Sequence, residues 1–437
     1  MTGRPRVLVV GAGWRFTSGI SYYTCRLTNA LAQRLPTDAL LVRRLVPKAL
    51  YPGRDRVGQV VNDVSYDPSV TVLEGLDWYW GASMARTARF LRERRPDVVV
   101  LQWWTGATLH SYLLLAALAH RQGAKVVMEW HEVQDTGEAR IPGVTRYVQA
   151  AMGLLLRRVD AHVVHSTHDL ELLEVAYGLR DDTHFVTVVP HGPYDHVSAT
   201  STDDSRNIGD TSDTSETIDT GDAGAEGGRC ARPSSDEPFT LLFFGIIRPY
   251  KGLEDLVEAF SLLPEEVRDT MRLRIVGETW EGWDTPLQAV AESPARDRID
   301  VVNRYVTDAE VREHFAQADA VVLPYRRSSA SGPLHMAMSA GLPVVVTAVG
   351  GLVDAAGDYQ GVSFVPPADP AALADTLRAL PARRGRRYAD PHTWEHSVDA
   401  YLRVFAGMGL PVPAAGAPED AVRATQMPET SPASLAS

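Results

Sequence analysis

The sequence predicts an α/β protein with two doubly wound domains, each a parallel sheet covered by helices on both faces. Continuous apolar runs alternate with helical segments along most of the chain, which is typical of parallel strands buried on both faces. The 437 residues, 45% of them hydrophobic, exceed what one ordinary core holds. A polar, acidic tract at 196–237 divides the alternating pattern into two parts.

The first domain is predicted to cover residues 1–195. Its apolar strand segments are expected at 6–13, 40–46, 70–75, 97–103, 125–131, 161–166 and 184–192. Helical segments are expected between them at 21–35, 82–94, 109–121, 144–158 and 168–177. Because strands and helices alternate, the strands are joined by helical crossovers, and we expect them to be parallel.

The tract at 196–237 holds ten acidic and three basic residues and almost no large apolar side chains. Such a composition predicts a disordered insertion between the domains. Alternation resumes at Phe239 and predicts a second doubly wound domain over 238–390. A helix over 391–410 is expected to pack back towards the first domain, followed by a flexible tail at 411–437.

The charge distribution argues against nucleic-acid binding. The net charge is −12, and no long basic face runs along the chain. Five arginines do cluster in the helical segment at 82–94 and just after it: Arg86, Arg89, Arg92, Arg94 and Arg95. A solvated outer helix face explains them better than peripheral contact with an anionic membrane, which stays a minor alternative.

The sequence predicts neither export nor a membrane span. The apolar run at the N-terminus is about seven residues long, and no run of 18 apolar residues occurs. Cys25 and Cys230 fit neither a disulfide framework nor a zinc pattern. We expect a cytoplasmic protein with free thiols.

A basic turn is the first candidate binding element. The segment FTLLFFGIIRPYKGLEDLVEAF places Arg248 and Lys251 between an apolar strand and an amphipathic helix, shortly after Gly245. Two cations at a strand's carboxyl end, just before a helix, are suited to holding a diphosphate. Taken alone, the pair could equally be solvated surface charge.

A second candidate element follows about eighty residues later, in PYRRSSASGPLHMAMSAGLPVVVT. Ser331 is a predicted helix N-cap, and Gly332 and Pro333 suit the first turn. The free N–H groups of such a helix start, with the hydroxyls of Ser328, Ser329 and Ser331, form a potential anion site. A capped helix with no ligand is the alternative, but the two elements together favour a phosphate site.

Two Rossmann-like domains carrying these elements resemble the GT-B glycosyltransferases, most closely the retaining family 4 of nucleotide-sugar transferases. The second-domain landmarks are FFGIIRPYKG, QADAVVLPY, AMSAGLPVVVTAVGG and GVSFVPPADPAAL. The first-domain landmarks are the glycine loop around Ser18 and Gly19, EWHE with His131, HSTHD and VVPHG. Their order and spacing cover nearly the whole chain and are more specific than the lone GAG near the N-terminus.

The resemblance implies a role for each matching residue. Arg248 and Lys251, beside Gly245, would grip the donor diphosphate, and His131 would reach the transferred sugar. The other donor-side positions implied are Ser18, Gly19, Ser331, Gly332, Pro333 and Leu334. His131 could instead be a core histidine at a strand end, and we interpret His165 and His191 as structural.

One departure from the family pattern concerns two glutamates that usually lie eight residues apart near the second element. This chain has Ser328 and Met336 at those positions, and neither is a carboxylate. One of these glutamates usually accepts a charge-assisted hydrogen bond from the nucleotide ribose, and its absence removes about 1.5–3 kcal/mol of binding free energy. The ribose must then be held by other groups, such as His335 or the backbone.

The expected function is metal-independent, retaining transfer of a sugar from a nucleoside-diphosphate sugar to a hydroxyl of a glycan, glycolipid or secondary metabolite. Front-face transfer depends on leaving-group stabilisation and positioning, which the missing glutamates do not remove. We expect no cofactor or metal, because no Asp-any-Asp pair stands at a strand end. The alternatives are a GT-B nucleotide-sugar-binding protein without turnover and, less favoured, a nucleotide-sugar epimerase.

Overall fold

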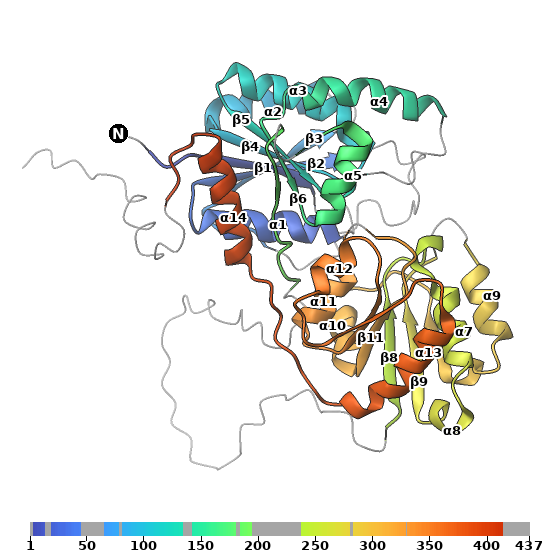
Figure 1. Cartoon of the computed structure of the whole chain (residues 1–437). Helices are drawn as coiled ribbons and strands as arrows, with labels where there is room; N and C mark the ends of the chain where they lie inside the picture. Colours follow the sequence, from blue (N-terminus) through green and yellow to red (C-terminus); the bar gives the residue numbers. More distant parts are fainter. Residues whose placement is uncertain are drawn as a thin grey trace, which may run out of the picture.

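The computed structural model contains two α/β domains, drawn one above the other in Figure 1. It describes residues 3–13, 19–44, 65–77, 81–133, 142–180, 184–194, 237–279, 283–328 and 330–413. The insertion predicted at 196–237, except for its last residue, lies outside the described residues. The same holds for the tail beyond residue 413, for Ser18 and for Cys230.

The first domain contains a parallel sheet of seven strands. These are β1 (Val7–Ala12), β2 (Thr37–Arg44), β3 (Thr71–Asp77), β4 (Val98–Trp103), β5 (Lys125–Trp130), β6 (Ala161–Val164) and β7 (Val186–Val188). The helices are α1 (Gly19–Ala32), α2 (Gly81–Arg94), η2 (Gly106–Thr108, a 3-10 helix), α3 (Leu109–Arg121), α4 (Pro142–Leu156) and α5 (Thr167–Tyr177). The strand order is β3-β2-β1-β4-β5-β6-β7, so the direction of winding reverses between β1 and β4.

The second domain contains a parallel sheet of six strands. These are β8 (Phe239–Phe244), β9 (Met271–Val276), β10 (Ile299–Val302), β11 (Ala320–Leu323), β12 (Val344–Thr347) and β13 (Val362–Val365). The α-helices are α7 (Leu253–Ser261), α8 (Glu265–Arg268), α9 (Thr285–Glu292), α10 (Asp308–Gln317), α11 (Gly332–Ser339), α12 (Gly351–Ala356) and α13 (Pro370–Ala379). The 3-10 helices are η5 (Pro249–Lys251), η7 (Arg296–Arg298) and η8 (Leu380–Arg383). The strand order is β10-β9-β8-β11-β12-β13, with the reversal between β8 and β11.

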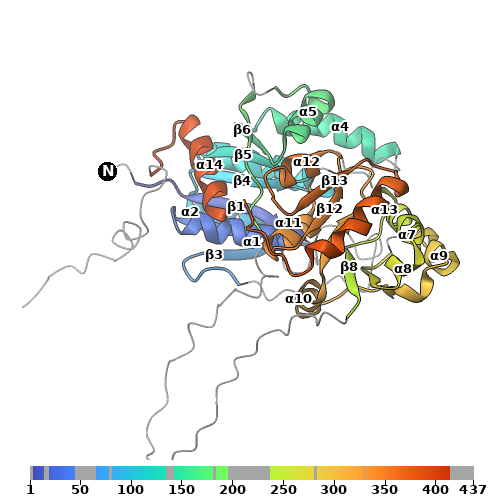
Figure 2. The same cartoon turned by 60° about the horizontal axis from the view of Figure 1, so that its bottom comes forward.

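The predicted α/β class with two parallel sheets is confirmed. Every residue of β1 and β4 is buried, which explains why these strands appear in the sequence as unbroken apolar runs. Helices cover both faces of each sheet but leave partly exposed side chains on strands such as β3 and β9. Figure 2 shows the same two layered domains from a second direction.

The arginine cluster is divided between two environments. Arg86, Arg89 and Arg92 are exposed on α2. Arg94 instead holds the buried carboxylate of Asp38 in two hydrogen bonds, of 2.9 and 2.6 Å. Among the described helices, none has both the length and the apolar character needed to cross a membrane.

The last helix, α14 (Trp394–Gly407), lies against α1 of the first domain (Figure 1). Tyr401 and Phe405 of α14 are fully buried in one cluster with Tyr23 and Leu27 of α1. The Ser397 hydroxyl also donates to the carbonyl of Pro190 at 2.8 Å. The C-terminal helix is therefore part of the first domain's core.

The carboxyl ends of the two sheets meet through loops and helix starts. His191, after β7, stacks on His335 of α11 with ring centroids 4.3 Å apart. The carboxylate of Asp354 in α12 accepts hydrogen bonds from the N–H groups of Thr167 and His168, at 2.5 and 3.4 Å. These N–H groups begin α5, where the helix dipole favours a negative charge. Asp354 thus caps a helix of the other domain.

Replacing Phe405 by Ala should destabilise the first domain by about 3–5 kcal/mol, because the substitution empties a fully buried site between α14 and α1. Urea unfolding followed by tryptophan fluorescence measures the change. Arg403→Ala, on the exposed face of the same helix, is the matched control and should change stability by less than about 0.5 kcal/mol. Equal effects of the two variants would contradict this role of α14.

Candidate functional site

Two glycines shape the turn after β8. Gly245 has φ of +115°, a conformation that side chains rarely adopt. Gly252, with φ of +59°, lies so close to the carbonyl of Pro324 that a Cβ would be 2.2 Å from its oxygen. These two positions therefore allow η5 to fold back over the end of β8.

Lys251 lies at the end of η5 and points back to Gly245. A Cβ on Gly245 would lie 2.8 Å from the Lys251 Nζ, and Nζ lies 5.1 Å from the centre of the Tyr325 ring. The lysine is only 7% exposed. Burial, and then the charge of Arg248, lower the pKa of Lys251 to about 7. A buried amine whose charged form is disfavoured in the free protein is a candidate for contact with an anionic ligand.

The start of α11 lies beside this lysine. The Ser331 hydroxyl accepts a hydrogen bond from the N–H of Leu334 at 3.3 Å and is the N-cap of the helix. A Cβ on Gly245 would be 3.3 Å from Cγ of Pro333, in the first turn of α11. The basic turn and the helix start thus lie together where the winding of the sheet reverses, which is the usual place for a ligand in such folds.

The other predicted second-domain residues divide into exposed and packed groups. Ser328 is partly exposed, and its hydroxyl donates to the carbonyl of Ala330 at 3.1 Å. Leu334 is fully buried in the core, and Met336 packs against that core. His335 is 1% exposed. Its ring stacks on that of His191 between the domains, and its contact with the ribose stays a prediction.

On the first-domain side, Gly19 begins α1 and lies against Tyr194. The Tyr194 hydroxyl donates to the Gly19 carbonyl at 3.0 Å. The same ring lies 3.8 Å from where a Cβ on Gly332 would stand, so Tyr194 lies between the starts of α1 and α11. Ser18, the other residue predicted in this loop, lies outside the described residues.

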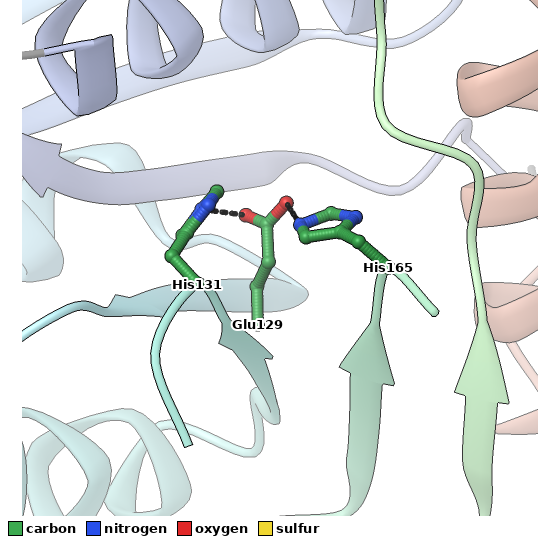
Figure 3. Close-up of side chains that lie close together, drawn as sticks. All are labelled: Glu129, His131 and His165. Atoms are coloured by element: carbon green, nitrogen blue, oxygen red, sulfur yellow. Dashed lines mark ion pairs between the residues drawn. The ribbon is translucent and has the colours of Figure 1, made fainter. Parts of the chain in front are cut away.

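A buried cluster at the ends of β5 and β6 surrounds Glu129 (Figure 3). Nε2 of His131 lies 3.6 Å from one carboxylate oxygen, and Nε2 of His165 lies 3.3 Å from the other. Gln102 of β4 donates to the first of these oxygens at 3.0 Å. The Glu129 side chain is fully buried, while that of His131 is 9% exposed. Three strands therefore contribute side chains to one buried carboxylate.

Ionisation in this cluster is set by the competition between burial and charge. Burial opposes ionisation of Glu129, but His131 and His165 outweigh it and hold the pKa of Glu129 well below its usual range. Burial also lowers the pKa of His131, and Glu129 offsets this only in part. At His165 the carboxylate outweighs burial and raises the pKa. These pKa shifts favour the ionised form of Glu129, the charged form of His165 and the neutral form of His131.

The same three groups are the candidates for metal ligation within the described residues, since their ligand atoms lie within 4.8 Å of one another. Figure 3 shows the two imidazoles on opposite sides of the carboxylate, each facing its own oxygen. A metal ligand set would converge on one point instead. The arrangement is that of two separate imidazole–carboxylate contacts.

Sequence reasoning identified His131 but missed its partners. Glu129 received no role, and His165 and His191 were interpreted as structural. The available signal was the Glu-any-His spacing in EWHE, which places both side chains on the same face at a strand end. His191 belongs to the same group of rings, with its centroid 5.1 Å from that of His165.

The two domains correspond to two family models. Residues 18–192 match the model described as "Glycosyl transferase 4-like domain", and residues 238–382 match "Glycosyl transferases group 1". Together the matches cover most of the chain. The chain belongs to the group 1 glycosyltransferases.

Curated relatives of this group 1 glycosyltransferase match over part of their length. It is 31% identical over 184 residues to D-inositol 3-phosphate glycosyltransferase from Geodermatophilus obscurus, covering 39% of this chain and 41% of the relative. It is 29% identical over 174 residues to O-antigen chain mannosyltransferase B from Escherichia coli, covering 38% and 45%. The chain thus spans less than half the length of these relatives.

Solved structures match nearly end to end at low identity. Sucrose-phosphate synthase from Thermosynechococcus elongatus gives a TM-score of 0.57 at 15% identity, covering 93% of this chain and 98% of that one. HepE of Anabaena, solved in complex with UDP-glucose, gives 0.56 at 14% identity, covering 97% and 99%. The likeness establishes the fold, and the predicted two-domain GT-B architecture is confirmed.

The lowered pKa of Lys251 is directly measurable, because the sequence contains only three lysines, Lys48, Lys125 and Lys251. With ¹³C-labelled lysine, one side-chain NMR signal should titrate near pH 7 and should be absent in Lys251→Met. In Gly245→Ala the added methyl displaces the ammonium towards water, so the titration should move up towards about 10.4. Gly178→Ala, at another positive φ with open space around it, is the control and should leave the titration unchanged. A Lys251 signal that titrates near 10 in the unmodified chain would contradict the buried placement of the ammonium.

Proposed function

We propose that this group 1 glycosyltransferase transfers a sugar from a nucleoside-diphosphate sugar to a hydroxyl acceptor, with retention of anomeric configuration and without a metal ion. The observation that carries the proposal is the meeting of Lys251 with the first turn of α11 at the reversal point of the second sheet. An ammonium, a guanidinium from Arg248 and helix-start N–H groups form a site for a diphosphate leaving group.

The proposed chemistry relies on stabilising the charge that develops as the sugar–oxygen bond breaks. Lys251 is buried, and its pKa of about 7 leaves it only partly protonated in the free site near neutral pH. A bound diphosphate supplies the counter-charge that favours its protonation. The ammonium then lies next to the leaving oxygen charge in a site shielded from water. The acceptor hydroxyl attacks from the face that the diphosphate leaves, which preserves configuration, and its proton passes to the departing phosphate oxygen.

The first domain is proposed to supply the sugar and acceptor side of the reaction. His131 lies at the carboxyl end of β5. Gly19 and Tyr194 join the first domain to the start of α11. The relatives named above act on D-inositol 3-phosphate and on the O-antigen chain, which supports a hydroxyl-bearing acceptor of the polyol or glycan class.

One observation favours a second candidate function, a nucleotide-sugar-binding protein without turnover. Ser328 and Met336 occupy the positions where the family usually has two glutamates, and Met336 is partly withdrawn into core packing. Such a protein would bind the diphosphate through Arg248 and Lys251 but release no free nucleoside diphosphate.

The double variant Arg248→Ala with Lys251→Ala tests the proposed transfer. Release of nucleoside diphosphate from UDP-glucose, GDP-mannose, ADP-glucose and TDP-glucose is measured with a panel of polyol and glycan acceptors. The variant should lose at least about 10³-fold in kcat/KM with the active donor, because both leaving-group charges are removed. Arg298→Ala, at the amino end of β10 and paired with Asp269, is the matched control and should keep wild-type rates.

The anomeric configuration of the product and the effect of a chelator on the rate test retention and metal independence. Anomeric NMR of the product should show the donor's configuration, and EDTA should leave the rate unchanged. Activity of the double variant within a few-fold of wild type would contradict the proposed leaving-group role. Tight diphosphate binding with no product from any donor would favour the binding-protein alternative.

Binding of the free nucleoside diphosphate should weaken as pH rises above about 7. The Lys251 ammonium loses its proton in the empty site near that pH, whereas the bound diphosphate raises its pKa, so binding takes up a proton. Calorimetry in buffers of different ionisation enthalpy should show this uptake, with affinity falling roughly tenfold per pH unit. In Lys251→Met both the proton uptake and this slope should disappear, and an unchanged slope would contradict the assignment.

A further inference from the structure

Three helices of the first domain cover the same face of its sheet. Phe90 of α2, Tyr112 of α3 and Met152 of α4 are buried in one cluster, so the inner sides of these helices pack on one sheet face. Helix α3 contacts both α2 and α4, and Figure 1 shows the three helices together at the top of the first domain. Their outer sides therefore form one continuous surface, which we call the α2–α4 face.

The charge of the α2–α4 face is opposite in sign to that of the chain. The three helices contain six arginines and one glutamate, whereas the whole chain has a net charge of −12. Arg86, Arg89 and Arg92 are exposed at every third position of α2. Unlike Arg94, which holds Asp38, none of these three is paired with a carboxylate in the part of the chain that the structure describes. Their charges are therefore available to an anionic partner.

Apolar side chains continue this surface beyond the arginines. Tyr147 and Leu154 of α4 are each 49% exposed, and their spacing of seven residues places them on one side of the helix. On α3, which lies between α2 and α4, Leu114 and Leu118 are partly exposed. Large apolar side chains gathered on adjacent helices, rather than scattered singly, indicate a surface that a partner covers.

The extent of the surface is limited by α5. This helix covers the same sheet face through Leu173, but its outer side carries the exposed carboxylates of Glu171 and Glu174. The combination of exposed arginines and exposed apolar side chains is thus confined to α2, α3 and α4 among the described helices of this sheet face.

An anionic membrane surface is the partner that fits both properties. Arginines bind lipid phosphates, and tyrosine and leucine side chains are stable at the boundary between headgroups and acyl chains. A second copy of the chain would bring like charges together at this face. A nucleic acid would leave the apolar side chains of α3 and α4 without an apolar partner, because its outer surface is polar and charged.

We propose that the α2–α4 face is a peripheral membrane-binding surface, on which Arg86, Arg89 and Arg92 contact anionic lipid phosphates while Tyr147 and Leu154 enter the headgroup boundary. The contact is peripheral, since none of the described helices is long and apolar enough to cross a membrane. The sequence pattern favoured a solvated helix for the arginines, because the fold alone brings α4 onto the same surface as α2. The proposal does not depend on the proposed function, and its test needs neither donor nor acceptor.

Co-sedimentation of the full chain with vesicles tests the proposal. The chain should bind vesicles of phosphatidylglycerol and phosphatidylcholine in equal parts, and should bind pure phosphatidylcholine vesicles at least about tenfold more weakly, because these lack the anionic charge. Raising the salt concentration to about 0.5 M should weaken binding to the anionic vesicles, since the contacts are exposed and screened.

The triple variant Arg86→Gln, Arg89→Gln and Arg92→Gln removes the proposed phosphate contacts. Each arginine near an anionic surface strengthens binding about fivefold, so the triple variant should bind the anionic vesicles about 100-fold more weakly. All three side chains are exposed, so the fold should be kept, and circular dichroism checks this.

The matched control is the triple variant Arg386→Gln, Arg387→Gln and Arg403→Gln. These arginines are also exposed but lie outside the α2–α4 face, so the control changes the net charge by the same amount. It should keep binding within about threefold of the unmodified chain, because its charges lie farther from the membrane than a Debye length of about 10 Å.

Leu154→Gln tests the apolar part of the surface. It should weaken binding about fivefold, because a half-exposed leucine no longer leaves water when the membrane binds. The matched control is Leu262→Gln, at the end of α7 in the second domain, where the leucine is 56% exposed. This control should leave binding to the vesicles unchanged.

Equal binding to anionic and neutral vesicles, or equal losses in the two arginine variants, would overturn the proposal. A chain that ignores vesicles but forms a dimer lost in Leu154→Gln would assign the α2–α4 face to a second copy instead. A chain that ignores vesicles but binds single-stranded RNA through Arg86, Arg89 and Arg92 would assign the face to nucleic acid. Either result would refute a membrane-binding surface.

Discussion

Both sheets are wholly parallel, and this constraint decides where the functional residues lie. In a parallel sheet, every strand delivers its carboxyl end to the same edge, so the loops that follow the strands gather there. The two domains meet along these edges, as the stacking of His191 on His335 and the capping of α5 by Asp354 show. A residue just after a strand in either domain is thereby brought towards the other domain.

Burial gives the charges at these edges their properties. Lys251 and Glu129 are both withdrawn from water, but they are compensated differently. Glu129 has His165 as a counter-charge within the same domain, so its ionised form is stable without a ligand. Lys251 lies over the ring of Tyr325 and has no anionic partner among the causes that set its pKa. Burial and the like charge of Arg248 disfavour its charged form until an anion binds. The charge of Glu129 is thus compensated in the free protein, whereas that of Lys251 is compensated when a ligand binds.

The C-terminal helix links these sites to the rest of the fold. Helix α14 follows the second domain in sequence but packs in the core of the first, where Tyr401 lies in one cluster with Tyr23. Tyr23 in turn contacts the rings of His131 and His191, at centroid distances of 4.7 and 4.4 Å. Packing of the last helix therefore supports the side chains that surround Glu129.

The α/β class, the two parallel sheets and the turn that carries Arg248 and Lys251 could be predicted from the sequence, because apolar periodicity, glycine turns and helix caps are local signals. The sequence also marked the start of α11 through Ser331. It could not reveal that Glu129 has His165 and Gln102 as partners, because the register between β4, β5 and β6 decides that contact. The ionisation of the buried groups likewise follows from the fold, since it depends on neighbours that are distant in the chain and on the water that packing excludes.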